Sequence, residues 1–338
     1  MEIVPGIHRI EVPIPNSLMG PTNVYLAQGT DGWLMVDTGW DYHEAREALK
    51  RQLDELGIGF DDISRIVITH VHIDHYTLIT RVKQLSGATT HFHQKDYEIL
   101  CAMSISKGEY AARLLKQFEV NGFPKDELSQ LTQIYNIGSR FPYPVDPPDV
   151  ALQDGDRIST GTFNFEVIWT PGHTPGNICL YEADKRILLT GDHVLPITTP
   201  NINMQAPTDD NPLKSYLASL KKVEKLDVEL VLPGHEHVFA HFHDRVEEIL
   251  SHHDERLGHV LQASRGGGKT AYQIAHEVPW VLEPQGFKVV SFEELAIMDK
   301  GMAVGETLAH LEYLRFEGRV ERDSRDGLTC YWVVGSLE

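Results

Sequence analysis

A histidine-rich segment that directly follows a strongly apolar run constrains the fold most. Residues 66–68 (Ile-Val-Ile) are β-branched, which is typical of a buried strand. The next seven residues, Thr69-His70-Val71-His72-Ile73-Asp74-His75, contain three imidazoles and one carboxylate. A tight loop at the end of a strand could bring these side chains together. Because zinc and similar divalent metals bind such groups, the segment predicts either a metal site or a histidine-rich surface loop.

Three later segments place the same residue types where an expected strand ends. His173 follows a strand at 163–170, Asp192 follows one at 186–190, and His235 follows one at 228–232. Glycines beside them suit tight turns and let the backbone approach an ion closely. Any one of these residues could be an ordinary surface or core residue. Coincidence is a poor explanation for four strand ends of this kind, so we expect these residues to form one metal site.

The rest of the chain up to residue 242 mixes both kinds of secondary structure. Further strands are expected at 7–12, 23–27, 33–36, 157–160 and 177–181, and helices at 42–56, 78–85 and 212–226. Residues 94–149 change character, with expected helices at 97–118 and 125–135 and a proline-rich stretch after them. We interpret them as a helical insertion, which is either a lid over the site or a surface addition.

These motifs resemble the metallo-β-lactamase superfamily. The motif His70-x-His72-x-Asp74-His75 is followed by His173, Asp192 and His235 in the order that the family shows, and Asp37-Thr38-Gly39 resembles its early aspartate motif. The resemblance covers about residues 5–242. It implies an α+β fold, a four-layer αβ/βα sandwich with the site at one edge of two facing sheets.

The resemblance also implies roles for these residues. One ion would be held by His70, His72 and His173, a second by Asp74, His75 and His235, and Asp192 would bridge them. Asp74 and Asp192 are thus the expected catalytic residues, and Asp74 would steer a bridging hydroxide or accept its proton. Asp37 either orients a metal-binding histidine or forms a simple turn. The expected cofactors are two divalent ions; zinc is favoured, and the same ligands accept iron or manganese.

Residues beside these ligands raise further alternatives. Tyr76 stands where many hydrolases of the family have glycine, so its ring either narrows the substrate pocket or packs into the core. His193 and His237 neighbour expected ligands, but we expect neither to bind a metal because the set is complete without them.

Residues 243–338 are expected to form a separate, smaller domain. Helices are expected at 243–264, 271–276 and 301–316, and a hairpin at 319–322 and 328–334. This order is typical of a winged helix, and it resembles the C-terminal extension of the β-lactamase-like protein 2 group. The segment 263–270 nearly matches a nucleotide-binding loop but follows a helix, so we interpret it as a linker with Thr270 capping the next helix. His252 and His253 are expected on a solvated helix face.

Charge argues against DNA as the partner of this domain. It has 17 acidic and 10 basic residues, and its third helix carries Glu306, Glu312 and Glu317 against Arg315 alone. Such a surface repels phosphate, so we favour a structural or dimerising module. The whole chain has a formal charge of −19, which disfavours nucleic acid and anionic membranes alike.

Composition favours a cytoplasmic protein. The three cysteines are far apart in the sequence and are expected to be free thiols in a reducing compartment. The sequence shows no signal peptide, and no apolar run approaches the ~18–20 residues that cross a bilayer.

The leading hypothesis is a binuclear zinc hydrolase, in which a metal-bridged hydroxide attacks a small ester, thioester or lactone. The alternatives are a phosphodiesterase or endoribonuclease, a mono-iron oxidoreductase of sulfur compounds, and a non-catalytic DNA-binding regulator.

Overall fold

The chain divides into two compact units. The computed structural model describes residues 1–15, 20–105, 107–138, 143–204, 210–282 and 288–335. The first unit comprises residues 1–101, 143–200 and 219–246, and the second comprises residues 102–142, 201–218 and 247–338. This division differs from the contiguous domains expected at 1–242 and 243–338. Most of the expected insertion shares a unit with the C-terminal residues.

The first sheet of the first unit has seven strands in sequence order. They are β1 (Glu2–Val4), β2 (Ile7–Val12), β3 (Thr22–Gln28), β4 (Trp33–Val36), β5 (Ile63–Val67), β6 (Thr89–His93) and β7 (Val150–Leu152). Strands β1 to β4 pair antiparallel, and β4 to β7 pair parallel. Because β4 and β5 are parallel, their carboxyl ends lie at the same edge of the sheet. Asp37 follows one of these ends and the histidine-rich segment follows the other.

The second sheet brings the remaining expected ligands to one edge. Its strands are β8 (Arg157–Ser159), β9 (Asn164–Trp169), β10 (Ile178–Glu182), β11 (Ile187–Gly191) and β12 (Leu230–Pro233), in the order β12-β11-β10-β9-β8. Strands β9 and β11 are both antiparallel to β10, and β12 is parallel to β11. Strands β9, β11 and β12 therefore end at the same edge, where His173, Asp192 and His235 follow.

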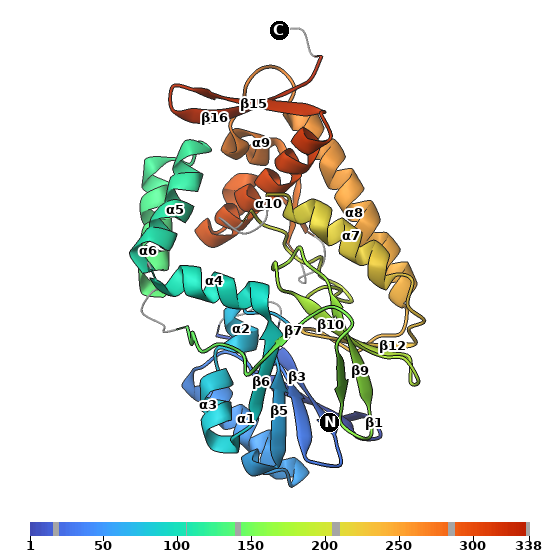
Figure 1. Ribbon diagram of the computed structural model, residues 1–338. Coiled ribbons are helices and arrows are strands. Elements are labelled where there is room, and N and C mark those ends of the chain that lie inside the picture. The colour runs from blue at the N-terminus through green and yellow to red at the C-terminus, as the bar shows by residue number, and fades with distance from the viewer. Residues whose placement is uncertain (16–19, 106, 139–142, 205–209, 283–287, 336–338) are drawn as a thin grey trace. The chain divides into compact units, whose positions relative to one another are not determined.

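Alternating side chains of β3 show how the layers pack. Val24 and Leu26 are buried with residues of α1 (His43–Leu56) and α3 (Ile79–Ser86). Tyr25 and Ala27 point the other way and are buried with residues of the second sheet, such as Phe165. Among these, a valine, leucine or phenylalanine side chain contributes about 1.5–3 kcal/mol when it is fully buried. Figure 1 shows α1 and α3 on the side of the first sheet that this alternation requires.

Helical residues also contact the second sheet, and the first unit has the expected four-layer α+β architecture. The last turns of α7 (Pro212–Val223) and the first turns of α8 (Phe242–Ala263) belong to this unit. Lys222 of α7 donates to the carbonyl of Trp169 in β9 at 3.0 Å. Arg245 of α8 donates to the carbonyls of Leu195 and Ile197, which follow β11.

The second unit is mainly helical. Its further elements are α5 (Lys107–Val120), α6 (Lys125–Gly138), α9 (Ala271–Glu277), β13 (Trp280–Leu282), β14 (Lys288–Val290), η2 (Phe292–Glu294), α10 (Ile297–Phe316), β15 (Val320–Arg325) and β16 (Leu328–Val333). The order of helices and hairpin expected after residue 243 is present, and the β13–β14 pair was not expected. That this region is a winged helix stays a prediction. The helix expected at 97–118 is two helices, α4 (Gln94–Ile105) and α5; residue 106 lies outside the described residues.

Polar contacts explain why the insertion joins this unit. Glu127 of α6 accepts from the Tyr272 hydroxyl at 2.9 Å and from Lys300 Nζ at 2.5 Å. Thr270 caps α9 as expected, with its hydroxyl accepting from the backbone NH of Gln273. The partners of Glu127 are more than a hundred residues away in the sequence, so local patterns cannot reveal them.

Two expectations about the second unit were wrong. His253 is 1% exposed and contacts His310, so it does not lie on a solvated helix face. Glu312 is 3% exposed and accepts from Arg315 and Arg322, so its charge is neutralised within the unit. Both errors have the same cause: the helices are buried on more faces than their sequences suggest. Among the described residues, none of the helices is both long enough and apolar enough to cross a membrane.

Candidate metal centre

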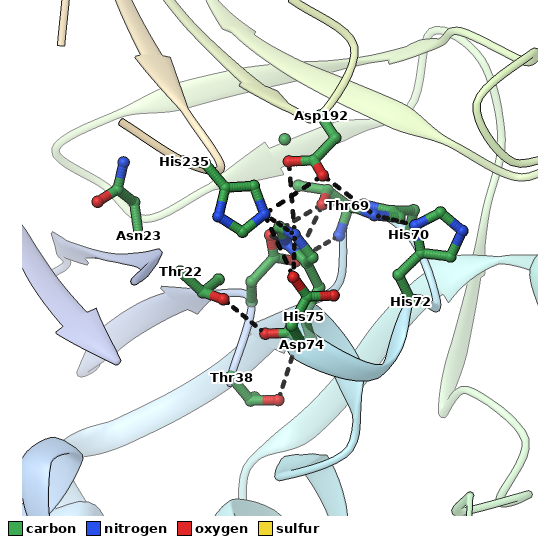
Figure 2. A network of polar contacts seen from close by, with 12 residues as sticks. Thr22, Asn23, Thr38, Thr69, His70, His72, Asp74, His75, Asp192 and His235 are labelled. Carbon is green, nitrogen blue, oxygen red and sulfur yellow. Dashed lines mark hydrogen bonds and ion pairs between the residues drawn. The ribbon is translucent and has the colours of Figure 1, made fainter. Parts of the chain in front are cut away.

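All seven expected ligands come together within the first unit (Figure 2 labels most of them). Three groups of side chains have donor atoms within 4.8 Å of one another and could hold an ion: His70 with His72 and His173; His70 with His75 and Asp192; and Asp74 with His75 and His235. We call the first the three-histidine group and the last the aspartate group. That these residues bind metal ions stays a prediction.

Asp192 lies between the three-histidine group and the aspartate group. Its Oδ2 atom is 3.9 Å from His70 Nε2 and 3.8 Å from His173 Nε2. The same carboxylate lies 3.3 Å from His235 Nε2 through Oδ2 and 3.4 Å from His75 Nε2 through Oδ1. A carboxylate in this place could contribute an oxygen to an ion in either group.

The spacing of the donor atoms fits tetrahedral coordination. At zinc–ligand distances of about 2.0–2.1 Å, tetrahedral ligand atoms lie roughly 3.3–3.4 Å apart. In the aspartate group, His235 Nε2 is 3.3 Å from Asp74 Oδ2 and 3.1 Å from His75 Nε2. In the three-histidine group, His70 Nε2 is 3.1 Å from His72 Nδ1. These donor sets therefore have both the chemistry and the spacing for divalent ions.

Asp37 fixes which nitrogen of two histidines faces the cluster. Its carboxylate accepts from His75 Nδ1 at 2.8 Å and from the Thr69 hydroxyl at 2.8 Å. Because the Thr69 hydroxyl proton is donated to Asp37, the 3.1 Å contact between Thr69 Oγ1 and His70 Nδ1 requires the histidine to donate. His70 and His75 thus both carry a proton on Nδ1 and turn Nε2 toward the cluster. Asp37 thus contacts a histidine of the cluster in the way that the expectation requires, and its role toward a metal-bound histidine stays a prediction.

His235 is oriented in the same way by the backbone. Its Nδ1 lies 3.1 Å from the carbonyl oxygen of Pro21, which can only accept. Its Nε2 and that of His75 then face one another at 3.1 Å. Two lone pairs at this distance repel unless a proton or a metal ion lies between them. This is the strongest sign in the geometry that a cation belongs here.

Buried carboxylates make the aspartate group favourable for positive charge. Burial lowers the pKa of His75, but Asp192, Asp74 and Asp37 outweigh burial and raise it well above the usual value. Burial likewise opposes protonation of His235, yet Asp192 raises its pKa to about 10. A divalent ion would supply the same charge and displace these protons.

The three-histidine group favours neutral imidazoles. Burial, followed by the neighbouring His173, lowers the pKa of His72 to about 3. Burial also lowers the pKa of His70 well below its usual value. Neutral imidazoles are the form that binds metals, so this group is ready to accept an ion at neutral pH.

The segment after His72 is a helical turn, where a loop was expected. This turn is α2 (Ile73–Tyr76), in which His75 N and Tyr76 N donate to the carbonyl of His72. The turn places Asp74 and His75 side by side at the cluster. Thr22 and Thr38 hold it in place by donating to the carbonyls of Asp74 and His75, both at 3.0 Å (Figure 2).

Tyr76 is in the core. It is fully buried, its ring contacts Phe92, and its hydroxyl donates to the carbonyl of Pro144 at 3.0 Å. This arrangement favours the alternative in which the ring packs into the core. His193 is buried and His237 is exposed, and neither is in a ligand group among the described residues. That they bind no metal stays a prediction.

Three supporting residues escaped the sequence analysis. They are Thr69, Asp96, and Glu236, which has a positive φ of 64° and accepts from the backbone NH groups of Ile197 and Thr198. Thr69 and Glu236 are neighbours of expected ligands, and that adjacency is the one signal that could have drawn attention to them. Asp96 gives no such signal, because it lies more than twenty residues from the nearest ligand in the sequence.

The family model for the metallo-beta-lactamase superfamily matches residues 18–235, which include every residue of the cluster. The chain belongs to this superfamily.

Proteins with similar sequences and structures include other members of this superfamily and a probable metallo-hydrolase. The probable metallo-hydrolase YqjP of Bacillus subtilis is 26% identical over 331 residues, which are 96% of this chain and 94% of that protein. The human acyl-coenzyme A thioesterase MBLAC2 is 27% identical over 248 residues, which are 70% of this chain and 80% of that protein. The crystal structure of a metallo-beta-lactamase family protein from Thermus thermophilus matches with a TM-score of 0.80 and 31% identity. The match covers 98% of this chain and all of that one.

Proposed function

We propose that this protein is a metal-dependent thioesterase that uses two divalent ions, most naturally zinc. The convergence of seven donor groups on one edge of two sheets carries the metal part of the proposal. The similarity to acyl-coenzyme A thioesterase MBLAC2 supports the thioester part, because it extends over most of both chains. Imidazole with carboxylate is a common ligand set for zinc.

The bound ions would lower the pKa of water and polarise the substrate carbonyl. Hydrolysis adds the oxygen of water to the thioester carbon, breaks the carbon–sulfur bond, and releases a carboxylic acid and a thiol that takes up a proton. The chain must therefore hold the ions, accept the proton from water and deliver it to the leaving sulfur.

Asp74 is the best-placed residue to accept that proton. Its side chain is 20% exposed, whereas those of Asp192 and Asp37 are 8% and 2% exposed. Burial raises the pKa of Asp74, but His75 and His235 outweigh burial and lower it to about 2. Asp74 is therefore an ionised carboxylate at neutral pH, and it has access to solvent.

Asp192 and Asp37 have supporting parts in this proposal. Asp192, between the two groups, would hold both ions at a fixed separation. Asp37 keeps Nε2 of His70 and His75 available to the ions, through one direct hydrogen bond and one through Thr69. Both roles set geometry before substrate arrives, which lowers the cost of reaching the transition state.

The test is hydrolysis of acyl-coenzyme A by the full chain loaded with zinc. The reaction is monitored through the free thiol that it releases. Substrates should cover several acyl lengths, with oxygen esters and lactones of the same acyl groups and a short RNA in parallel. We expect thioesters to be cleaved faster than the other substrates, and chelation of the metal to abolish the activity. Asp192→Asn should be inactive, and the exposed control Asp54→Asn should be unaffected. Cleavage of RNA but not of any thioester would overturn the proposal in favour of a phosphodiesterase.

A further inference from the structure

Asp96 is a buried carboxylate outside the ligand set that connects two ligand-bearing segments. It lies in the first turn of α4, just after β6, and is 0% exposed. It accepts three hydrogen bonds, from the backbone NH of Val71 at 3.0 Å, from the Thr174 hydroxyl at 2.9 Å and from the backbone NH of Gly176 at 2.7 Å. These three donors offset part of the cost of burying the carboxyl group.

The donors belong to the segments that carry the three-histidine group. Val71 lies between His70 and His72, and Thr174 directly follows His173. One segment follows β5 of the first sheet, and the other connects β9 to β10 of the second sheet. Oδ2 of Asp96 accepts from both segments, through Val71 and Thr174, and Oδ1 accepts from Gly176. Asp96 therefore connects the edges of the two sheets at the point where the three histidines meet.

The aspartate group is held by other residues. Asp37 contacts His75, the carbonyl of Pro21 orients His235, and Thr22 holds the backbone of Asp74. Asp37 also orients His70 through Thr69. Asp96, however, accepts its hydrogen bonds from the segments of the three-histidine group, so a change at Asp96 should act on that group more than on the aspartate group.

The Asp96 side chain can approach the backbone at position 176 closely because that residue is glycine. A Cβ atom at position 176 would lie 2.6 Å from Cγ of Asp96 and 2.6 Å from its backbone nitrogen. Any larger residue would push against both the side chain and the backbone of Asp96. Glycine at this position therefore keeps the space in which the carboxylate accepts from the Gly176 NH.

We propose that Asp96 is a positioning residue that holds His72 and His173 at the spacing required for the ion of the three-histidine group. This inference rests on the proposed function, because it requires that the group binds a metal ion. Groups that orient metal ligands typically change metal affinity by about 10–100-fold when they are replaced. We expect an effect of this size on one ion and little effect on the other.

The experiment uses the full chain in two backgrounds. His235→Ala disrupts the aspartate group and leaves the three-histidine group whole, whereas His72→Ala does the reverse. Asp96→Asn is added to each, and the zinc dissociation constant is measured by competition with an indicator chelator. In the His235→Ala background, Asp96→Asn should weaken zinc binding by about 10–100-fold. In the His72→Ala background, the same change should alter it by less than about threefold, well below that range.

A matched pair at Thr174 supplies a second readout. Thr174→Ser keeps the hydroxyl that donates to Asp96, and Thr174→Val removes it with little change of volume. In the His235→Ala background, the valine variant should bind zinc more weakly, and the serine variant should bind it as the parent does. With cobalt in place of zinc, Asp96→Asn should also change the visible absorption spectrum of the ion in this background.

Three results are decisive. Equal weakening in both backgrounds would show that Asp96 supports the fold in general and would overturn the inference. Unchanged zinc binding in both would do the same. If neither parent background binds zinc, the proposed metal centre itself fails, and the role of Asp96 fails with it.

Discussion

Asp37→Asn tests the orientation of the metal-binding histidines most directly. Three donors converge on the two oxygens of Asp37: the Thr69 backbone NH, the Thr69 hydroxyl and His75 Nδ1. Asparagine keeps the shape but replaces one oxygen by an NH₂ group, so at least one donor must face another donor. If the NH₂ group faces His75, the imidazole proton must move from Nδ1 to Nε2. The nitrogen that faces the cluster then has no lone pair for an ion.

The expected cost follows from this change. Replacing a group that orients a metal ligand weakens metal binding by about 10–100-fold, which corresponds to about 1.4–2.7 kcal/mol. Zinc affinity is measured by chelator competition, with Asp54→Asn as the control, because Asp54 is an exposed carboxylate that pairs with Lys50 at 2.6 Å. An Asp37→Asn protein that is folded by circular dichroism and binds zinc within about twofold of the parent would refute the reasoning, because about tenfold is the least effect expected.

Three further predictions follow from the structure. Removing the metal with a chelator should lower the unfolding temperature, and adding zinc should restore it. The lost stability is about 2.7 kcal/mol for one site if free zinc had been at 100 times its dissociation constant. Tyr76→Phe removes the hydrogen bond to Pro144, so it should lower the free energy of unfolding, measured in urea, by about 0.5–1.5 kcal/mol. A large fall in thioester hydrolysis with unchanged stability would instead place Tyr76 in the substrate pocket. Burial lowers the pKa of His310 to about 3. Below about pH 6.5, His310 therefore binds a proton in the unfolded chain but not in the folded chain. The folded state loses stability as the pH falls from about 6.5 toward 3, by up to about 1.4 kcal/mol per pH unit. His310→Gln should flatten this slope in urea titrations between pH 7 and 4, whereas the exposed control His259→Gln should not.

Much of the metal centre could be predicted because strand ends are local features of a sequence. The apolar runs before His70, Asp192 and His235 identify buried strands, and the residues after them must lie at a sheet edge. The direction of each strand was not predictable from spacing. The resemblance to the superfamily supplied the missing information, namely which strand ends share an edge.

Long-range contacts account for what the sequence did not reveal. The hydrogen bonds from Tyr272 and Lys300 to Glu127 place the insertion in the second unit, and no periodicity in residues 102–142 indicates those partners. Asp96 is similar: its acidic side chain at the start of a helix has an ordinary explanation as a favourable charge at the helix dipole. The structure shows that its partners lie near His72 and His173 instead.

Local patterns also understate burial. The charged and polar residues of α8 and α10 predict solvated faces, yet His253, His310 and Glu312 are at most 3% exposed. Each has a polar contact inside the second unit, so the cost of burying it is partly offset. A sequence pattern can identify an amphipathic helix, but it cannot show when a second partner covers the polar face.

The number of metal ions bound per chain tests the central claim most directly. The full, untagged protein would be purified without added metal, and its metals measured by elemental analysis against protein concentration from amino-acid analysis. Because the cluster contains two donor groups with Asp192 between them, we predict about two ions per chain, with zinc predominant. A protein that binds no divalent metal, even after dialysis against zinc, would contradict the account.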